Sequence, residues 1–202
     1  MKETVIGAVL AGCRGRRMGG DKALLELGGQ TLAQRAVDVL RETGLEVALV
    51  LRAEQPAPPV VDTVAVVRDR VEEAGPLGGI HALLGWLPAE WALVAPCDQP
   101  FLAPKVLRGL LDQRRDDVDA VVAQPDDLME PLPGLYRRTL MSTIEEALAR
   151  GQGSLQDLLA SVQVRTVQAE TLRQWDPQLL SFTNVNTRQE LAWATAVLHR
   201  ER

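Results

Sequence analysis

The chain has 202 residues, 46% of them hydrophobic and 24% charged, a globular composition that can bury a core, so we expect one domain. Its formal net charge of −5 argues against a general nucleic-acid or membrane binder, because both need spread positive charge. Cys13 and Cys97 lack the spacing of a zinc site, and the apolar run at residues 5–11 is too short to span a membrane. We therefore expect a reducing, cytoplasmic location.

Strands and helices are predicted to alternate along the chain. Residues 5–10 form a nearly continuous apolar run typical of a buried parallel strand. Thr31 and Gln34 form a capping-box pattern ahead of a helix that Gly44 closes. Further predicted strands are 47–51, 64–67, 91–95, 120–123, an edge strand at 135–137 and a weak one at 162–167. Further predicted helices are 80–86 after the glycine-rich turn 75–79, one that begins at Pro104, 139–150, and one that Thr187 and Glu190 cap.

This alternation predicts an α/β fold, a single three-layer Rossmann-like domain with a mostly parallel sheet. In such folds ligands bind at the carboxyl ends of the strands. The residues that follow the predicted strands are therefore the candidate functional residues.

The segment after the first strand, residues 14–22, is strongly basic. Four of its nine residues are arginine or lysine and one is aspartate, a local net charge of +3 in an acidic protein. Glycine lets backbone N–H groups approach oxyanions, and arginine and lysine bind phosphates, so the segment predicts a triphosphate cradle. A flexible basic loop is the alternative. The pattern matches neither the P-loop nor the dinucleotide-binding motif.

Two further positions carry candidate ligands. Asp98 follows the strand at 91–95 between prolines, where a carboxylate could hold Mg²⁺ that bridges to substrate phosphates; a turn aspartate that caps a helix is the alternative. Asn184 and Asn186 flank Val185 in an extended segment, so both amides share one face and suit a polar heterocycle. Ordinary turn chemistry before Thr187 is the alternative there.

These motifs resemble a known family. Leu10-Ala11-Gly12, followed by Arg17-Met18-Gly19 and Asp21-Lys22, is similar to the signature of the molybdenum cofactor guanylyltransferases. Other blocks occur in the order expected for that family, namely residues 75–79, 96–100, 131–136 and 184–187. The resemblance covers nearly the whole chain.

The resemblance implies a fold of the nucleotidyltransferase type that transfers GMP from GTP to molybdopterin and releases pyrophosphate, with Mg²⁺ as cofactor. It implies a nucleotide-binding part at about residues 1–110 and an acceptor-binding part at about 111–202. Transient contacts with other cofactor-biosynthesis proteins or with recipient molybdoenzymes are also expected. The implied catalytic residues are Arg17, Lys22 and Asp98, with Asp98 as metal ligand; the nucleotide-binding residues are Leu10, Ala11, Gly12, Lys22, Asp69 and Asp98; the acceptor-binding residues are Asn184 and Asn186.

Two alternative functions stay open. One is the related cytidylyltransferase, whose signature begins Leu-Ala-Ala-Gly where this chain has Leu10-Ala11-Gly12. The other is a nucleotide-binding domain without turnover. Two departures from the family pattern motivate them: Cys13 stands where glycine is usual, and residues 50–52 lack an expected asparagine. Cys13 and Cys97 each follow a predicted strand, so an oxidation-sensitive pair is a further hypothesis, against two independent reduced thiols.

Overall fold

A computed structural model describes residues 4–12, 14–15, 20–59, 64–69, 71 and 74–200. Its main sheet has seven strands in the order β11-β9-β10-β8-β1-β6-β7. All neighbouring strands are parallel except the two pairs that β10 makes, which are antiparallel. The strands are β1 (Val5–Leu10), β6 (Val47–Arg52), β7 (Ala65–Asp69), β8 (Trp91–Pro96), β9 (Ala120–Gln124), β10 (Glu130–Arg137) and β11 (Val164–Gln168).

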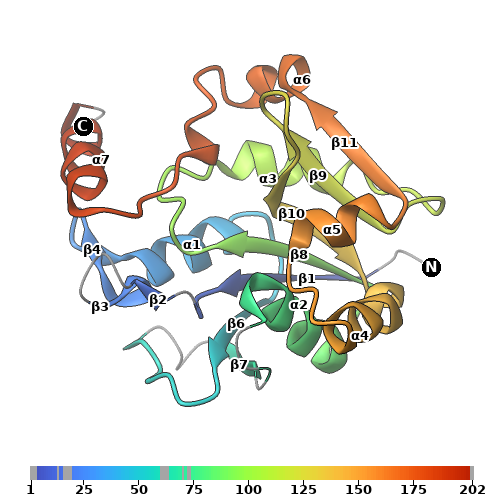
Figure 1. Cartoon of the computed structure of the whole chain (residues 1–202). Coiled ribbons are helices and arrows are strands. Elements are labelled where there is room, and N and C mark those ends of the chain that lie inside the picture. Colours follow the sequence, from blue (N-terminus) through green and yellow to red (C-terminus); the bar gives the residue numbers. More distant parts are fainter. Residues whose placement is uncertain are drawn as a thin grey trace.

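Helices cover both faces of this sheet, and Figure 1 shows α1 and α3 on one side and α2 and α4 on the other. One buried cluster joins the sheet to α1, α3 and α6, and a second joins it to α2, α4 and α5. The predicted three-layer α/β fold is therefore confirmed. The helices are α1 (Leu32–Arg41), α2 (Gly75–Trp86), α3 (Pro104–Leu111), α4 (Met141–Ala149), α5 (Leu155–Ala160), α6 (Ala169–Trp175) and α7 (Arg188–Arg200).

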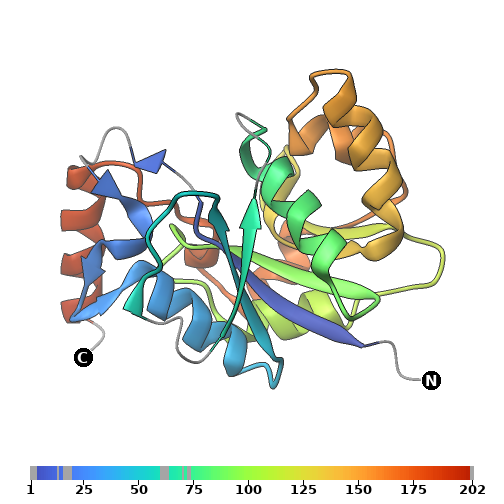
Figure 2. The ribbon, with the colours of Figure 1, turned by 90° about the horizontal axis from the view of Figure 1, so that it is seen from below.

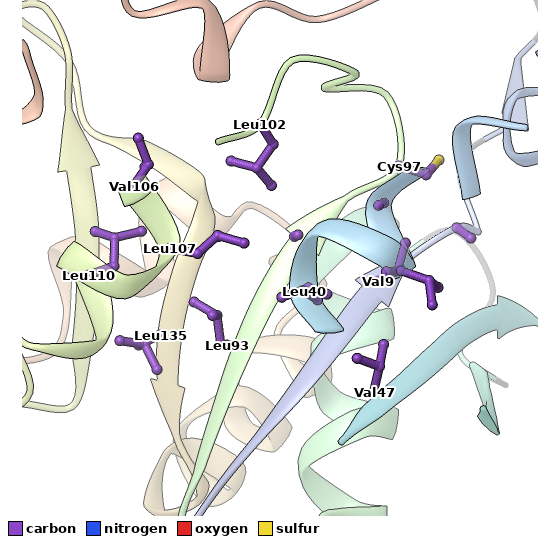
Figure 3. Close-up of a cluster of buried hydrophobic side chains, with 14 of the residues drawn as sticks. Val9, Leu40, Val47, Leu93, Cys97, Leu102, Val106, Leu107, Leu110 and Leu135 are labelled. Carbon is purple, nitrogen blue, oxygen red and sulfur yellow. The ribbon is translucent and has the colours of Figure 1, made fainter. Parts of the chain in front are cut away.

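Double coverage explains the continuous apolar runs in the sequence. In β1, Val9 belongs to the first cluster, whereas its neighbours Ala8 and Leu10 belong to the second. Successive side chains of a strand point to opposite faces, so a strand covered twice must be apolar at every position. Figure 3 shows the first cluster, where Leu40 of α1 and Leu107 of α3 lie over the strand residues.

The strand predicted at the edge of the sheet lies inside it instead. Residues 135–137 belong to β10, which pairs antiparallel with both β8 and β9. The edges are β7 and β11. The prolines at positions 131 and 133 obscured the start of β10, because proline interrupts a ladder and lowers a strand prediction; here the pairing with β9 shifts register between Glu130 and Gly134.

Two other sequence predictions need correction. The glycine-rich segment 75–79 is not a turn before a helix but the first part of α2, with a proline at its beginning, where the missing N–H is tolerated. Thr31 caps α1 by accepting from the Gln34 N–H, but the Gln34 side chain donates to Asp38. The capping box is thus only half formed.

The C-terminal helix packs outside the main layers. In both Figure 1 and Figure 2 α7 stands beside the short hairpin of β4 (Glu26–Leu27) and β5 (Gln30–Thr31). A small buried cluster of Leu27, Leu32, Val185 and Ala194 joins these elements. Within the described ranges, no helix combines the length and apolar character needed to cross a bilayer.

Candidate functional site

The parallel strands bring the candidate residues to one edge of the sheet. β1, β6, β7 and β8 run in the same direction, so their carboxyl ends lie side by side. β10 runs the opposite way, and its first residues therefore lie beside the end of β8. This is the edge at which ligands of open α/β sheets bind.

Lys22 lies at the centre of this edge. Its ammonium is 2.7 Å from Asp98 Oδ2 and donates to Asn186 Oδ1 at 2.5 Å. Lys22 itself is only 7% exposed. A lysine is this deeply buried only when its charge is paired, and here one carboxylate and one amide oxygen serve it. Three segments that are distant in sequence thus meet at one nitrogen.

Backbone contacts hold the C-terminal segment against the same site. The Val185 N–H donates to the Asp98 carbonyl at 2.8 Å. The Glu190 carboxylate accepts from the N–H groups of Asn186 and Thr187, while Thr187 Oγ1 accepts from the Glu190 N–H. These contacts confirm the capping box before α7. The Asn186 N–H in particular lowers the pKa of Glu190 below its ordinary value, and the nearby Lys22 charge adds to this.

The end of β1 is tied to its neighbours at this edge. The Ala11 N–H donates to the Val50 carbonyl at 2.9 Å, which ties the end of β1 to β6. A Cβ atom at Gly12 would lie 3.4 Å from the Arg52 side chain, so glycine allows these two strand ends to approach closely. Leu10, Ala11 and Gly12 therefore all lie at the edge that the sequence predicted.

Asp69 is the last residue of β7. The neighbouring Arg68 does not pair with it but donates to backbone carbonyls at positions 52, 53 and 55. Asp69 accepts from the Val71 N–H at 2.9 Å, and a Cβ atom at Gly78 would lie 2.8 Å from its Oδ2. Burial raises the pKa of Asp69, which the Val71 N–H and His81 partly offset.

Two residues of this edge had no sequence signal. Gln55 is 4% exposed and donates to Ala11 O and to Asp21 Oδ2. It sits in an irregular, proline-rich connection, where sequence pattern gives no indication of burial. Glu130 begins β10, and burial raises its pKa, with the carboxylates of Asp126 and Asp98 adding to the effect.

Arg17 and Cys13 lie outside the described residues, so their predicted roles stay predictions. Cys97 is buried, at 2% exposure, just after β8. Asn184 belongs to the extended segment that leads to Val185, and its predicted contact with the acceptor also stays a prediction.

The oxygen atoms around Lys22 suit a hard cation. Asp98 and Asn186 already converge on one positive charge, the Lys22 ammonium. Carboxylate and amide oxygens are ligands that hard cations take, and Mg²⁺ in particular needs only one or two carboxylates when substrate phosphates and water complete its shell. In the part of the chain that the structure describes, no group of three or more His, Cys, Asp or Glu residues forms a metal site on its own.

Comparison with known proteins identifies the family. A family model described as a MobA-like NTP transferase domain matches residues 7–169. A molybdenum cofactor guanylyltransferase from Desulfosudis oleivorans is 34% identical over 97% of this chain and 96% of its own length. A probable molybdenum cofactor guanylyltransferase from Methanothermobacter thermautotrophicus is 34% identical over 95% of this chain and 99% of its own.

Solved structures give the same result. The crystal structure of molybdopterin-guanine dinucleotide biosynthesis protein A from Archaeoglobus fulgidus is 28% identical and covers 96% of this chain and 98% of its own, with a TM-score of 0.84. The fold, the site at the carboxyl edge and these matches define a nucleotidyltransferase. More particularly, the chain belongs to the molybdenum cofactor guanylyltransferase family.

Proposed function

We propose that this protein transfers GMP from GTP to the phosphate of molybdopterin in the cytoplasm. An oxygen of the molybdopterin phosphate attacks the α-phosphorus of GTP and forms the new P–O bond. The bond from the α-phosphorus to the oxygen that bridges to the β-phosphorus breaks, and its electron pair leaves with pyrophosphate. Membership of the guanylyltransferase family supports this reaction.

One observation carries the proposal: Lys22 joins Asp98, which lies two residues after β8, to Asn186 of the C-terminal segment. A buried cation that lies between the two predicted halves of the site can meet phosphates of both substrates. Phosphoryl-type transfer needs positioning and charge neutralisation more than covalent catalysis. A paired lysine at this edge supplies both.

The nucleotide binds along the ends of β1, β7 and β8 in this proposal. Leu10, Ala11 and Gly12 line the nucleotide side in this proposal, and Asp69 approaches the nucleotide beside the first turn of α2. Lys22 donates to the triphosphate, and Arg17 adds a second donor from the basic segment. Residues 1–110 would thus form most of the nucleotide side.

Asp98 is the proposed ligand for Mg²⁺. When bound, the ion would supply positive charge against the charge that develops on the phosphates. Lys22 lies 2.7 Å from Asp98 Oδ2, so an ion held by Asp98 would either share this carboxylate with Lys22 or displace the Lys22 ammonium towards the phosphates. The flexible four-carbon stem of Lys22 permits that movement.

Asn184 and Asn186 bind the acceptor in this proposal, and residues 111–202 supply most of that side. The contact of Asn186 with Lys22 supports an acceptor that lies directly beside the triphosphate. After transfer, the product would pass to recipient molybdoenzymes or other cofactor-biosynthesis proteins through transient contacts.

The decisive experiment measures pyrophosphate release by the purified protein with molybdopterin and either GTP or CTP, with and without Mg²⁺. We expect release with GTP and acceptor together, and its loss when a chelator removes the metal. Faster release with CTP would instead identify a cytidylyltransferase. GTP binding without release in the presence of acceptor and metal would identify a binding domain without turnover.

A further inference from the structure

Gln55 hydrogen-bonds to residues near both ends of the basic segment, residues 14–22. Its Nε2 donates to the Ala11 carbonyl at 2.8 Å and to Asp21 Oδ2 at 2.6 Å. Ala11 lies three residues before the basic segment 14–22, and Asp21 is its next-to-last residue. One amide nitrogen therefore joins residue 11 to residue 21.

The Gln55 side chain uses its full donor capacity there. An amide NH₂ has two hydrogens, and both meet oxygen atoms of Ala11 and Asp21. The Gln55 Oε1 accepts from the Arg52 N–H at 3.2 Å. A buried amide with these three contacts has little freedom to turn, because any rotation leaves buried polar groups unpaired.

A second residue holds Gln55 in place from the neighbouring strand. Arg68 of β7 donates through Nη1 to the Gln55 carbonyl at 2.5 Å and to the Arg52 carbonyl at 3.0 Å. The turn after β6 is thus fixed to β7, and Gln55 is fixed with it. The ends of β1, β6 and β7 and the end of the basic segment form one network.

Asp21 connects this hydrogen-bond network to Lys22. While Oδ2 accepts from Gln55, Oδ1 accepts from the Ala23 N–H at 3.1 Å and so caps the short 3₁₀ helix Lys22–Leu24. Arg52 Nη2 lies 3.8 Å from the same Oδ2. The backbone direction at Lys22, and with it the position of the ammonium, depends on how Asp21 is held.

We propose that Gln55 is a positioning residue for the triphosphate: by holding Asp21 against the Ala11 carbonyl, it places the Lys22 ammonium for the phosphates. This inference rests on the proposed function for its ligand. A glutamine that only stabilises the turn after β6 would affect stability but not the preference for a triphosphate.

The test compares Gln55→Glu and Gln55→Met with the unchanged protein. Glutamate keeps the shape but removes both donors and sets a carboxylate against Asp21; methionine removes the donors without adding charge. Calorimetric titration with GTP and with GMP gives the ratio of the two affinities. We expect GTP affinity to fall roughly ten- to a hundredfold, since unpaired buried groups are costly, and GMP affinity to fall less.

A rescue and a control make the result specific. In Gln55→Glu with Asp21→Asn, the new amide can donate to the new carboxylate, so we expect part of the GTP affinity to return. Glu90→Ala is the matched control, because it breaks an ion pair with Arg137 at the opposite end of β8. It should lower the melting temperature without changing the ratio of affinities.

Limited digestion with trypsin tests the contacts of Gln55 with Ala11 and Asp21 without any nucleotide. Arg14, Arg16 and Arg17 are cleavage sites between these two residues, and both Gln55 variants should be cut there several times faster, as mass spectrometry of the fragments would show. Unchanged cleavage together with an unchanged affinity ratio would overturn the positioning role of Gln55. Failure of the unchanged protein to bind GTP would overturn the proposed function, while the cleavage rates would still test whether the Gln55 contacts hold the segment.

Discussion

Lys22 shows how a single charge can be stable inside this protein, and in the proposed function the same charge serves the substrate. Its partners are one carboxylate and one amide oxygen, from Asp98 and Asn186. Three ammonium hydrogens can meet more oxygens than these two. A phosphate oxygen can therefore join or replace them without leaving the charge unpaired.

Lys22→Ala should weaken the binding of GTP more than that of GMP. A lysine at the end of the basic segment is expected to meet the distal phosphates, which GMP lacks. Hydrogen bonds to charged groups contribute about 1.5–3 kcal/mol, so we expect roughly a ten- to a hundredfold loss for GTP. Titration calorimetry measures both, with Lys105→Ala on exposed α3 surface as control. An equal loss for the two nucleotides would place Lys22 away from the distal phosphates.

Glu130 is a residue whose charge should destabilise the fold at neutral pH. Burial raises its pKa above the ordinary 4.5, helped by Asp126 and Asp98. The folded protein therefore holds this proton more tightly than the unfolded chain. As the pH rises from 4.5 towards the folded pKa, the unfolded state loses its proton first, and the contribution of Glu130 to stability falls.

Glu130→Gln removes that titration and should raise the melting temperature at about pH 7, with the difference closing towards about pH 4. The amide oxygen can still accept from the Leu132 N–H that Glu130 uses. Thermal melts across this pH range measure the difference, and Asp127→Asn, at an exposed position of the loop before β10, should change the melting temperature little. A lower melting temperature at neutral pH would mean that the ionised carboxylate stabilises the fold.

At the scale of elements, the pair α3 and α6 depends on one glycine. A Cβ atom at Gly109 of α3 would lie 2.6 Å from three ring atoms of Trp175 in α6. Real Cβ atoms do not approach a ring so closely, so either the ring or the helix would have to move. The absence of a side chain at this position lets the indole lie flat on α3.

Gly109→Ala therefore tests packing against helix propensity, because the two effects predict opposite changes in the free energy of unfolding. In an unconstrained helix interior alanine stabilises by about 0.5–1 kcal/mol relative to glycine. Overpacking here should outweigh this and destabilise by about 1–3 kcal/mol. Urea denaturation measures the change. Lys105→Ala on the exposed face should stay within about 0.5 kcal/mol, and Gly109→Ala combined with Trp175→Leu should recover stability. A more stable single variant would refute the packing account.

At the scale of the whole molecule, the proposed nucleotide and acceptor parts share one sheet. β8 belongs to residues 1–110 and hydrogen-bonds to β10, which belongs to residues 111–202. Both buried clusters also take residues from the two parts, such as Leu40 and Leu135 in the first. Neither part could retain its core after the other unfolded.

We therefore predict a single unfolding transition. Calorimetry should give a ratio of calorimetric to van't Hoff enthalpy of about one, and circular dichroism and tryptophan fluorescence should follow the same curve. Trp86 lies in the first part and Trp175 in the second, so fluorescence samples both. Two resolved transitions would show that the parts unfold as separate domains.

The sequence by itself determined the fold class and the positions of most candidate residues. Continuous apolar runs such as that of β1 predict strands covered on both faces, and chemically unusual residues then stand where those strands end. These are local patterns, and local patterns are readable along the chain. The same reasoning found the cap of α7, because Thr187 and Glu190 are three residues apart.

Only the tertiary structure decided which distant residues meet. Three features depend on residues that are far apart in sequence. They are the position of β10 beside β8, the contact of Lys22 with Asn186, and the two contacts of Gln55 with Ala11 and Asp21. A buried glutamine and an exposed one look alike in a proline-rich connection, since side-chain burial depends on what packs over it. Strand order and hydrogen-bond partners follow from the packing of the complete sheet, and no short sequence pattern contains that information.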